Sequence, residues 1–545
     1  ETGFDDSKWL EPVKHGDLKA PVARPIPFME ESIRYPERIE LVEECTWLKN
    51  RTRTNDLSIN LSQVGRPLKY ARVDDLKKLT TCRGPAVIQC STNHLKDPTF
   101  DGVQEPCIVF DYGRVITGCI ELDLDGVAGA SVDIGVVERL IDGHFNNSLE
   151  GEFAFRYVMK DGKQTWRTFS WHAFRYVRLR FHECFKPVKL KAIKAVVTRY
   201  PYEEKGRFES SDKQLNKVFD ICRYTMRICC HESIMDTPWR EQAQWVGDIS
   251  CVTSGGIYAC FGDTRLVDKF MRQTNAAPFR TGFMQKVTNG KEPPTNRTIP
   301  DYSYWWMMRI WHHYMYTGER SFLTDTFDNV QRVIETSKQY LDADSQLANV
   351  PLWVFIDWAN IDRDGRNAAF NAIFIGTLEA SARIAGELGR KDRADEYTAL
   401  AGKMRANFIK CYFDQKKGVF VDANKDGKLS KMISEHSNVA AIHFGLSDEK
   451  MTAGIIQRLY EKKTVPYVEA TPFFTAVVLR ALDDAGRCDL AVKIIKDRWG
   501  KRMVDNGATS LYEEWGENGS WRSGHYEGFI RTHSHAWSSA PGEFL

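Results

Sequence analysis

The feature of this 545-residue chain that most constrains its fold is a change of residue pattern close to residue 205. Before that point, short β-branched segments alternate with Gly, Pro and Asp turns. The stretch from Ile120 to Asp125, for example, alternates apolar and acidic residues as a half-buried strand does. After that point, apolar residues recur at helical spacing in stretches separated by short loops. The change predicts a multidomain chain, with a sheet-rich domain over residues 1–205 and an all-helical domain over residues 206–545.

Each half indicates an architecture. The sheet-rich half predicts one or two antiparallel β-sandwiches, followed by a linker over Thr198 to Gly206. In the helical half, paired helices follow one another in succession, which favours an (α/α)6 barrel. The predicted helix starts lie close to Lys213, Pro238, Thr264, Tyr302, Arg320, Ala368, Arg390, His436, Asp448, Pro472, Cys488 and Gly528.

The overall charge and the motifs that are missing argue against several classes of partner. Lys and Arg total 75 and Asp and Glu total 73, a net charge of +2, so no global field attracts nucleic acid or a membrane surface. The sequence has no P-loop, no Gly-rich dinucleotide fingerprint and no apolar run near the ~18 residues of a membrane helix. Its 13 cysteines include no Cys-x-x-Cys pair. We therefore expect no cofactor, no metal, no nucleic acid partner and no membrane partner.

One short stretch imitates a metal site. Asp422 to Ser430 matches an EF-hand calcium loop at positions 1, 3, 5, 6 and 9, but position 12 is Ile433, where such a loop needs a bidentate Glu. Its Asp-Gly pair is typical of a tight turn between two short strands. We therefore predict a hairpin here and no calcium site.

The evidence on localisation is indirect. The chain begins Glu1-Thr-Gly3 without a Met, which is typical of a processed terminus from which a secretion signal has been removed. Possible glycosylation acceptors of the form Asn-x-Ser/Thr occur at Asn50, Asn60, Asn146, Asn296 and Asn518. We expect a secreted or otherwise extracytoplasmic protein.

Residues 236–248, Asp-Thr-Pro-Trp-Arg-Glu-Gln-Ala-Gln-Trp-Val-Gly-Asp, hold three carboxylates, an arginine and two tryptophans. Thr237 and the proline after it are typical of a helix N-cap and first helical position, so we predict a helix that begins here. At about 100° per residue, Glu241, Trp245 and Asp248 would then share one face of the helix.

Acids and an indole on one face are typical of a sugar site. The indole stacks on the ring, one acid donates a proton and other acids bind hydroxyl groups. The plainer alternative is a solvated helix face with a tryptophan in the core. Three acids so close together repel one another, and such an arrangement normally persists for a function, so the crowding favours a site.

The sequence pattern of this segment, Asp-x-Pro-x-Arg-Glu-Gln-x-x-Trp-x-Gly-Asp, resembles the active-site motif of the α-L-rhamnosidases of glycoside hydrolase family 78. The resemblance extends along most of the chain and implies the same barrel, with a pocket where the helix-joining loops gather. Family members usually continue into a C-terminal β-sandwich, for which the present sequence has no counterpart. Further segments similar to the family's β-sandwich, barrel and second-carboxylate segments are Val109–Arg114, Phe169–Arg178, Phe208–Asp212, Ser434–Asn438, Thr471–Phe474 and Gly507–Trp515.

The resemblance implies roles for the carboxylates. Glu241 would be the general acid and Glu513 the general base of a glycoside hydrolase. Glu514 stands beside Glu513 and is the alternative base, although the alignment of Leu-Tyr-Glu-Glu-Trp with the family's Leu-Trp-Glu-x-Trp favours Glu513. The residues that would bind rhamnose hydroxyl groups are Asp236, Arg240 and Asp248, with Trp245 as the stacking indole.

The resemblance also implies an apolar side of the pocket, where the 6-deoxy methyl group needs a dry contact. Asp357 and Trp358 resemble a loop that forms the floor of the family's pocket, and the alternative for Trp358 is an ordinary aromatic at a helix edge. Further candidates are Trp353 and either Trp305 or Trp306, since adjacent residues of one helix cannot both face one pocket. A pocket histidine is implied at His535, with His533 or a structural histidine as alternatives.

The leading hypothesis is an inverting exo-α-L-rhamnosidase with a rhamnoside as its substrate. The alternatives are a same-fold glycosidase for another sugar, an inactive carbohydrate-binding homologue, and a polysaccharide lyase. Intact Glu241 and Glu513 argue against the inactive homologue, and a pair of carboxylates argues against the lyase, which would use Tyr, His or Arg as its base.

Overall fold

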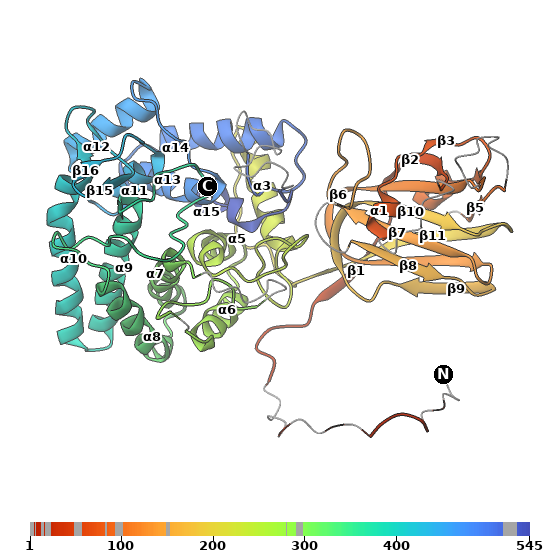
Figure 1. The fold of residues 1–545 in the computed structure, drawn as a ribbon, viewed down its shortest axis with the longest axis horizontal. Coiled ribbons are helices and arrows are strands. Elements are labelled where there is room, and N and C mark those ends of the chain that lie inside the picture. The colour runs from red at the N-terminus through yellow and green to blue at the C-terminus, as the bar shows by residue number, and fades with distance from the viewer. Residues whose placement is uncertain are drawn as a thin grey trace.

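The computed structural model consists of a sheet-rich N-terminal region and a helical C-terminal region, which lie side by side in Figure 1. Strand β11 (Val188–Arg199) ends the first region and helix α3 (Lys213–Ile228) begins the second, so the boundary that we predict at residue 205 lies between them. The structure describes residues 5, 7–11, 13, 16, 23–47, 57–81, 84–92, 102–148, 153–279, 281–289, 298–515 and 531–545.

The sheet-rich region is built on an antiparallel sheet of 11 strands, which confirms the predicted β-rich first half. The first half of the long strand β6 pairs with β2 and β10, and its second half pairs with β9 and β11, so one strand joins two sets of neighbours. The elements before β11 are β1 (Glu30–Arg34), β2 (Arg38–Cys45), α1 (Leu57–Leu61), β3 (Arg66–Pro67), β4 (Arg72–Asp74), α2 (Lys77–Thr81), β5 (Ala86–Gln89), β6 (Glu105–Gly126), β7 (Ser131–Val137), β8 (Ala154–Val158), β9 (Gly162–Arg167) and β10 (His172–His182).

A network of buried charges connects three of these strands. Arg180 of β10 donates to the carboxylate of Glu105 in β6 at 2.8 Å, and His182 bonds both Glu105 and Asp133 of β7. Burial opposes the charged form of His182, but the two carboxylates outweigh it and raise its pKa to about 9. Because the loss of one member would leave another buried and unpaired, the network holds β6, β7 and β10 in one register.

Among the described residues, the helical region continues from α3 through twelve further helices. They are α4 (Val246–Asp248), α5 (Ser254–Phe261), α6 (Arg265–Ala276), α7 (Pro300–Thr317), α8 (Arg320–Lys338), α9 (Ala368–Glu387), α10 (Lys391–Tyr412), α11 (Glu435–His443), α12 (Glu449–Ile456), α13 (Pro472–Asp484), α14 (Cys488–Ile495) and α15 (Pro541–Phe544). Three π-helical segments, η1 (Ile249–Thr253), η2 (Gln457–Glu461) and η3 (Lys496–Val504), and a 3-10 turn, η5 (Ala536–Ser538), adjoin them.

Most of the predicted helix starts are confirmed, because capping signals lie in the local sequence. The carboxylate of Asp212 accepts the backbone N–H groups that open α3, and prolines occupy the first positions of α7 and α13. The start predicted near Pro238 is wrong, because a loop occupies that position. The start predicted near Gly528 lies outside the described residues.

The calcium-like stretch forms the hairpin that we predict. Strands β15 (Ala423–Lys425) and β16 (Lys428–Leu429) pair across a turn in which Asp426 and Gly427 have φ of 52° and 80°. Both angles lie in the left-handed region that a tight hairpin turn requires. The other short strands of the helical region are β12 (Arg366–Asn367), β13 (Phe413–Asp414) and β14 (Val419–Phe420).

The two regions are packed against each other. A hydrophobic cluster of the sheet also includes Ile228 of α3, Trp239 and Ala536 from the helical region. Phe153 stacks on Trp239 with ring centroids 5.0 Å apart, and the Tyr224 hydroxyl donates to a carbonyl of β6 at 2.5 Å. The helical region therefore buries apolar surface against the sheet as well as against itself.

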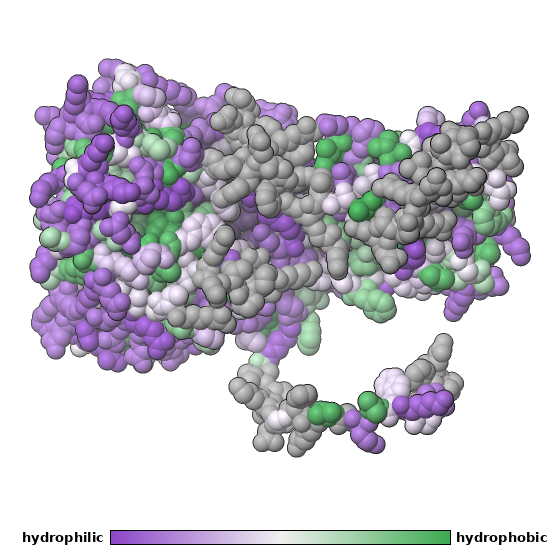
Figure 2. Space-filling view, in the orientation of Figure 1, coloured by the Kyte–Doolittle hydropathy of each residue, from purple (hydrophilic) through white to green (hydrophobic). Residues whose placement is uncertain are grey.

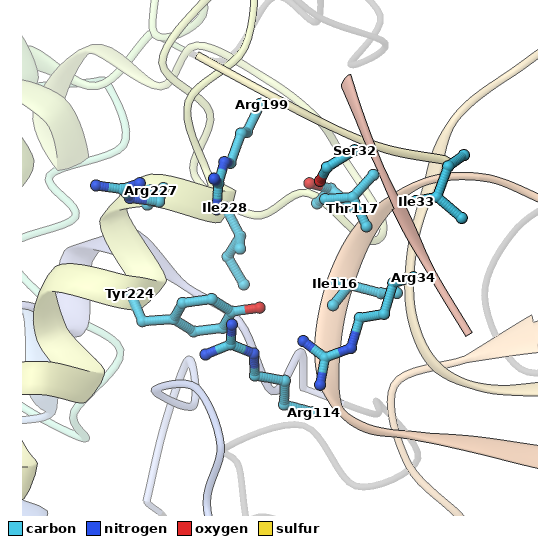
Figure 3. Close-up of a pocket in the computed structure, with 11 residues that line it drawn as sticks. Ser32, Ile33, Arg34, Arg114, Ile116, Thr117, Arg199, Tyr224, Arg227 and Ile228 are labelled. Atoms are coloured by element: carbon cyan, nitrogen blue, oxygen red, sulfur yellow. The ribbon is translucent and has the colours of Figure 1, made fainter. Parts of the chain in front are cut away.

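A cavity of about 310 Å³ lies at the same junction, between strands β1, β6 and β11 and helix α3 (Figure 3). Four arginines line it: Arg34, Arg114, Arg199 and Arg227. Three of them are paired with glutamates of neighbouring segments, and the guanidinium of Arg114 lies over the ring of Tyr224. These charges are therefore largely compensated within the protein.

The outer surface of the helical region is mostly hydrophilic in the view of Figure 2, with hydrophobic residues in small groups. Among the helices that the structure describes, none has the length and apolar character needed to cross a bilayer.

Candidate active site

Residues 236–245 form a loop and not the helix that we predicted. The N–H of Asp236 donates to the carbonyl of Ala243 at 2.9 Å, and the carboxylate of Asp236 accepts from the N–H of Ala243 at 3.1 Å. Gln242 has φ of 51°, which an α-helix does not accommodate. Helix α4 begins only at Val246. The expectation that Glu241, Trp245 and Asp248 share a helical face is therefore wrong.

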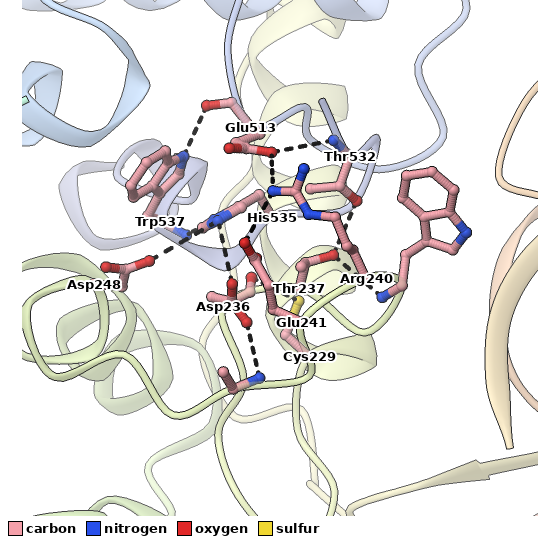
Figure 4. Close-up of polar contacts among 12 residues, drawn as sticks. Cys229, Asp236, Thr237, Arg240, Glu241, Asp248, Glu513, Thr532, His535 and Trp537 are labelled. Carbon is pink, nitrogen blue, oxygen red and sulfur yellow. Dashed lines mark hydrogen bonds and ion pairs between the residues drawn. The ribbon is translucent and has the colours of Figure 1, made fainter. Parts of the chain in front are cut away.

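The loop nevertheless brings its glutamate to the second predicted carboxylate, and Arg240 lies between the two (Figure 4). Nη2 of Arg240 lies 3.0 Å from Oε1 of Glu241 and 3.5 Å from Oε2 of Glu513. The side chain of Glu241 is 23% exposed and that of Glu513 is 4% exposed. One carboxylate of the pair is thus accessible and the other is enclosed.

Glu513 is held as an anion. Nη1 of Arg531 lies 3.0 Å from its Oε1, and the N–H of Thr532 donates to its Oε2 at 3.2 Å. Burial opposes ionisation of Glu513, but the charges of Arg240 and Arg531 outweigh it and hold its pKa below the usual range. The indole of Trp537 donates to the backbone carbonyl of Glu513 at 2.8 Å, which fixes the backbone under the carboxylate.

The neighbouring Glu514 differs from Glu513 in the direction of its pKa shift. Its Oε2 lies 3.2 Å from Nε of Arg531, on the other side of that guanidinium from Glu513. Burial raises the pKa of Glu514 to about 7, although Arg531 opposes the rise. The two adjacent glutamates therefore differ in charge near neutral pH.

Asp236, Asp248 and His535 form a buried group beside these carboxylates. Nε2 of His535 lies 3.9 Å from a carboxylate oxygen of each aspartate (Figure 4). Burial and then the charge of Glu241 raise the pKa of Asp236 well above its ordinary value, and burial raises the pKa of Asp248 to about 8. Burial also lowers the pKa of His535 to about 3. These shifts favour neutral groups that can both donate and accept hydrogen bonds.

Aromatic rings form a wall next to this group. Tyr302 of α7 donates its hydroxyl to Asp248 at 2.8 Å and meets Trp245 edge-on at 6.2 Å between ring centroids. A Cβ on Gly247 would lie 2.1 Å from the ring of Tyr302, so only glycine lets α4 approach α7 this closely. Tyr302 also contacts Phe355, and the other rings around Phe355 are those of Trp353, Trp358, Phe473 and Trp537.

The segment 353–358 is anchored by a buried acid. The carboxylate of Asp301, at the start of α7, accepts the N–H groups of Phe355 and Ile356, each at 3.1 Å. Ile356 has φ of 57°, a strained conformation for a β-branched residue, which these two bonds maintain. The guanidinium of Arg531 lies 5.0 Å from the ring centroid of Trp358, which joins the segment to the carboxylate cluster.

Two predicted pocket residues have other surroundings. The carboxylate of Asp357 is fully buried and bonds His436 at 2.6 Å and both the N–H and the hydroxyl of Thr471. Trp305 is buried in the helical core, and its ring lies 6.5 Å from that of Phe444. A contact with substrate stays a prediction for both residues.

Several residues of the site are not apparent from the sequence alone. Asp301 and Tyr302 follow a helix-initiating proline and carry no other local signal. Arg531 and Thr532 lie in a run of polar residues, Arg-Thr-His-Ser-His, whose density of hydrogen-bonding groups was the available signal. Trp537 is two residues beyond the predicted His535, with ring centroids 4.2 Å apart.

Two family models match the sequence. The bacterial alpha-L-rhamnosidase 6 hairpin glycosidase domain matches residues 203–545, and the bacterial alpha-L-rhamnosidase concanavalin-like domain matches residues 102–198. The first model covers more than half of the chain, including Glu241 and Glu513.

Two curated relatives are also named alpha-L-rhamnosidase. An alpha-L-rhamnosidase from Formosa agariphila is 23% identical over 436 residues, which are 75% of this chain and 44% of the relative. An alpha-L-rhamnosidase from Alteromonas sp. (strain LOR) is 22% identical over 450 residues, which are 76% of this chain and 46% of the relative. The chain thus spans less than half the length of these relatives.

Solved structures share the fold. A GH78 family rhamnosidase of Bacillus sp. GL1 matches with a TM-score of 0.77 and 25% identity over 88% of this chain and 49% of its own. A rhamnosidase from Klebsiella oxytoca with rhamnose bound matches with a TM-score of 0.76 and 17% identity over 95% of this chain and 96% of its own. Together with the match to the domain model, these likenesses show that the chain belongs to the family of bacterial α-L-rhamnosidases with a six-hairpin glycosidase domain.

Proposed function

We propose that this protein is an inverting exo-α-L-rhamnosidase whose helical region is an (α/α)6 barrel and whose sheet-rich region is a β-sandwich. The observation that carries the proposal is the meeting of Glu241 and Glu513 at the guanidinium of Arg240. Glycoside hydrolysis needs one carboxyl group at the leaving oxygen and a second carboxylate for water or for the anomeric carbon. Family membership and the names of the relatives support rhamnose as the sugar.

In this proposal Glu241 protonates the departing oxygen. Its side chain is the more exposed of the pair, so it can reach a leaving group that faces the solvent. Asp236, whose pKa is raised by burial and by the charge of Glu241, keeps a proton beside it. Arg240 orients the carboxyl group through its 3.0 Å contact. A positioned acid of this kind contributes roughly 10²–10⁴ to the rate.

Glu513 then acts as the base. It removes a proton from water while the water oxygen bonds to the anomeric carbon and the glycosidic bond breaks. Its lowered pKa keeps it ionised for this task. We favour Glu513 over Glu514, because Glu513 shares Arg240 with the acid, whereas Glu514 has a pKa of about 7 and contacts Arg531.

The remaining residues of the site bind the sugar. Asp236, Asp248 and His535 offer neutral donors and acceptors to hydroxyl groups. The rings of Trp245, Trp353 and Trp358 offer a dry surface to the ring face and the methyl group. Asp357 holds the base of this surface through His436 and Thr471.

The spacing of the carboxylates does not by itself decide the stereochemistry. Because one nitrogen of Arg240 contacts both, the nearest oxygens of Glu241 and Glu513 are no farther apart than the sum of its two contact distances. That upper limit coincides with the lower end of the range of about 6.5–9.5 Å for inverting pairs, so the two contacts are also compatible with the separation of about 5–5.5 Å of retaining pairs. The sequence resemblance favours inversion, and the anomer of the product is the test.

The deciding experiment uses an aryl α-L-rhamnoside beside a panel of other aryl glycosides. We expect hydrolysis of the rhamnoside alone, and proton NMR within minutes of mixing should show β-L-rhamnose first, before mutarotation. Hydrolysis of a different member of the panel would replace rhamnose as the substrate. Initial release of the α anomer, or a covalent sugar adduct on Glu513, would make Glu513 a nucleophile and exclude single displacement.

A further inference from the structure

A buried carboxylate of the sheet-rich region lies against the segment that completes the pocket. Glu138 directly follows strand β7, and its side chain has no exposed surface. It accepts hydrogen bonds from the Thr532 hydroxyl at 2.8 Å, from the His533 N–H at 2.8 Å and from the Ser534 hydroxyl. All three donors belong to the helical region. Glu138 therefore joins the two regions through three donors of one short segment.

Thr532 also forms hydrogen bonds with Glu513, the proposed base. Its N–H donates to Oε2 of Glu513 at 3.2 Å, and its carbonyl accepts from the N–H of Glu513 at 3.0 Å. The residue before it, Arg531, pairs with the other oxygen of Glu513. A displacement of Thr532 would therefore move the backbone and the carboxylate of Glu513 together.

The same threonine also contacts the loop of the proposed acid. The hydroxyls of Thr532 and Thr237 lie 2.9 Å apart, and the N–H of Trp239 donates to the Thr237 hydroxyl at 3.2 Å (Figure 4). An N–H can only donate and a carboxylate can only accept, so the intervening hydroxyl protons all point from Trp239 toward Glu138. This is a directed chain of hydrogen bonds from the 236–245 loop to the sheet-rich region.

Glu138 is suited to end such a chain. Burial raises its pKa, whereas its hydrogen bonds and the charge of Arg139, 3.9 Å away, oppose the rise. Three donors converge on one carboxylate, and without them it would be a buried group with unsatisfied acceptors. The contact is therefore specific in geometry, and an apolar residue of similar size could not replace it.

We propose that Glu138 is a positioning residue, which holds the Glu241 loop and the Glu513 loop in register through Thr532, and that the sheet-rich region thereby takes part in catalysis. The proposal rests on the proposed function for its kinetic consequences. Carboxyl groups displaced by about 1 Å can cost on the order of 10²-fold in rate, so the effect belongs in kcat.

The test compares Glu138→Ala, Thr532→Val and the double variant in hydrolysis of an aryl α-L-rhamnoside. We expect each single variant to lower kcat by about 10- to 100-fold and to change KM by less than about threefold. Because both changes break one chain, the double variant should be no slower than the slower single variant. Additive losses in the double variant, or an unchanged kcat in either single variant, would overturn the proposal.

A conservative variant keeps the test valid if Glu138→Ala fails to fold. In Glu138→Gln the amide oxygen can accept from Thr532 and His533, and the amide nitrogen can donate to the Ser534 hydroxyl, which can rotate to accept. We expect this variant to retain most of the wild-type kcat. A loss as large as that of Thr532→Val would show that the charge of Glu138, and not its geometry, matters, and would overturn positioning as the role.

The matched control is Glu105→Gln. Glu105 is also a buried carboxylate of the sheet-rich region, but its hydrogen-bond partners Arg180 and His182 lie within that region. We expect this variant to lower the melting temperature and leave kcat of the folded protein unchanged. A fall in kcat equal to that of Glu138→Ala would mean that any destabilisation of the sheet slows the enzyme, which contradicts a specific role for Glu138.

Hydrogen exchange separates failure of this proposal from failure of the proposed function. An inactive wild-type protein would overturn the function, and the contact would still be measurable without substrate. Amides of residues 531–536 and 511–515 should exchange faster in Glu138→Ala and Thr532→Val than in Glu105→Gln. Equal exchange in all three variants would show that Glu138 does not hold the segment.

Discussion

Arg240 shows how a single side chain can contact two carboxyl groups for which we propose opposite tasks. Its guanidinium lies within 3.5 Å of carboxylate oxygens from two distant loops, and it lowers the pKa of Glu513. Both contacts are made by one nitrogen, Nη2, whose two N–H groups have fixed directions in the guanidinium plane, unlike those of a lysine ammonium. Much of the repulsion that the crowded sequence segment implies is therefore compensated at this residue.

The role of Glu241 can be tested through the leaving group. Glu241→Gln should lower turnover of an alkyl rhamnoside, a poor leaving group, by a factor on the order of a hundred or more. An activated aryl leaving group needs little protonation, so its turnover should fall much less. Steady-state kinetics on both substrates make the comparison, with Glu514→Gln as the variant of a nearby glutamate. Equal losses on the two substrates would remove Glu241 from the acid role.

Asp248 should impose a pH dependence on stability. Its pKa is about 8 in the folded protein, against an ordinary value of 3.8, so the folded form keeps a proton that the unfolded form has lost. The free energy of unfolding therefore falls as the pH rises between these two pKa values, by about 1.4 kcal/mol per pH unit for one group.

Asp248→Asn should remove that contribution and flatten the fall in unfolding free energy between pH 7 and 8. Glu514, with a pKa of about 7, and His182, with a pKa of about 9, also lower stability as the pH rises through this interval, but they do so in both proteins, so the difference between the two slopes reports Asp248. Denaturant unfolding of both proteins at several pH values gives the slopes. Equal slopes would show that Asp248 is already ionised in the folded protein.

At this scale the motif alone was enough to name Glu241, Arg240, Asp236 and Asp248, which the structure brings together. It could not name Thr532 or Glu138, because their importance lies in contacts across 394 residues of sequence. Asp357 shows a second limit of prediction from sequence, because the residue was predicted but its partners were not. The resemblance predicts it in the pocket floor, which stays a prediction, and the use of its carboxylate by His436 and Thr471 depends on two helices that the sequence does not place.

At the scale of elements, helix starts were predictable where a cap or a proline is local, as at α3, α7 and α13. The loop over 236–245 was not, although it begins with good capping residues. Its backbone bonds between Asp236 and Ala243, and the contact of Thr237 with Thr532, stabilise a loop that intrinsic propensity disfavours. Tertiary contacts therefore outweighed the local helix signal in the loop that carries Glu241.

The segment 353–358 should depend on α7 through Asp301. In Asp301→Asn, an amide NH₂ would face one of the two backbone N–H groups that the carboxylate accepts, which leaves a buried donor unsatisfied at a cost of about 1–3 kcal/mol. Because this segment carries Trp353 and Trp358, and neither Glu241 nor Glu513, we expect KM to rise more than kcat falls.

Kinetics and melting temperatures of Asp301→Asn and Asp342→Asn together test this expectation. Asp342 also accepts two N–H groups of a loop in the helical region, from Asp344 and Gln346, but on one oxygen, while its other oxygen pairs with Arg366, so it serves as a loop-anchoring carboxylate at another place. Its variant should leave KM unchanged. A KM for Asp301→Asn equal to that of the wild type would show that the segment keeps its conformation without the carboxylate.

At the scale of the whole molecule, the sheet-rich region should be needed for a stable helical region. Residues 206–545 expressed alone would expose Trp239, Ile228 and Ala536, which pack in a cluster of the sheet. We expect this fragment to be unstable or inactive, and limited proteolysis of the whole chain not to release it in active form. A stable fragment with full activity would reduce the sheet-rich region to a dispensable neighbour.

The division into two regions was visible in the sequence because periodicity reports burial along each element. How tightly the regions join was not visible, because contacts such as Phe153 with Trp239 connect residues whose proximity depends on the complete fold. The same holds for the cavity lined by four arginines, whose members are scattered from residue 34 to residue 227.

The segment 531–536 also fixes when the pocket can exist during biosynthesis. Glu138 and the loop over 236–245 are translated long before Arg531 and Thr532, which supply their partners and those of Glu513. A ribosome adds about 5–20 residues per second, so a nascent chain spends on the order of 20–80 seconds with Glu138 made and Thr532, 394 residues later, absent. During that interval Glu138 lacks its three donors, so this contact between the two regions can form only after residue 534 has been made.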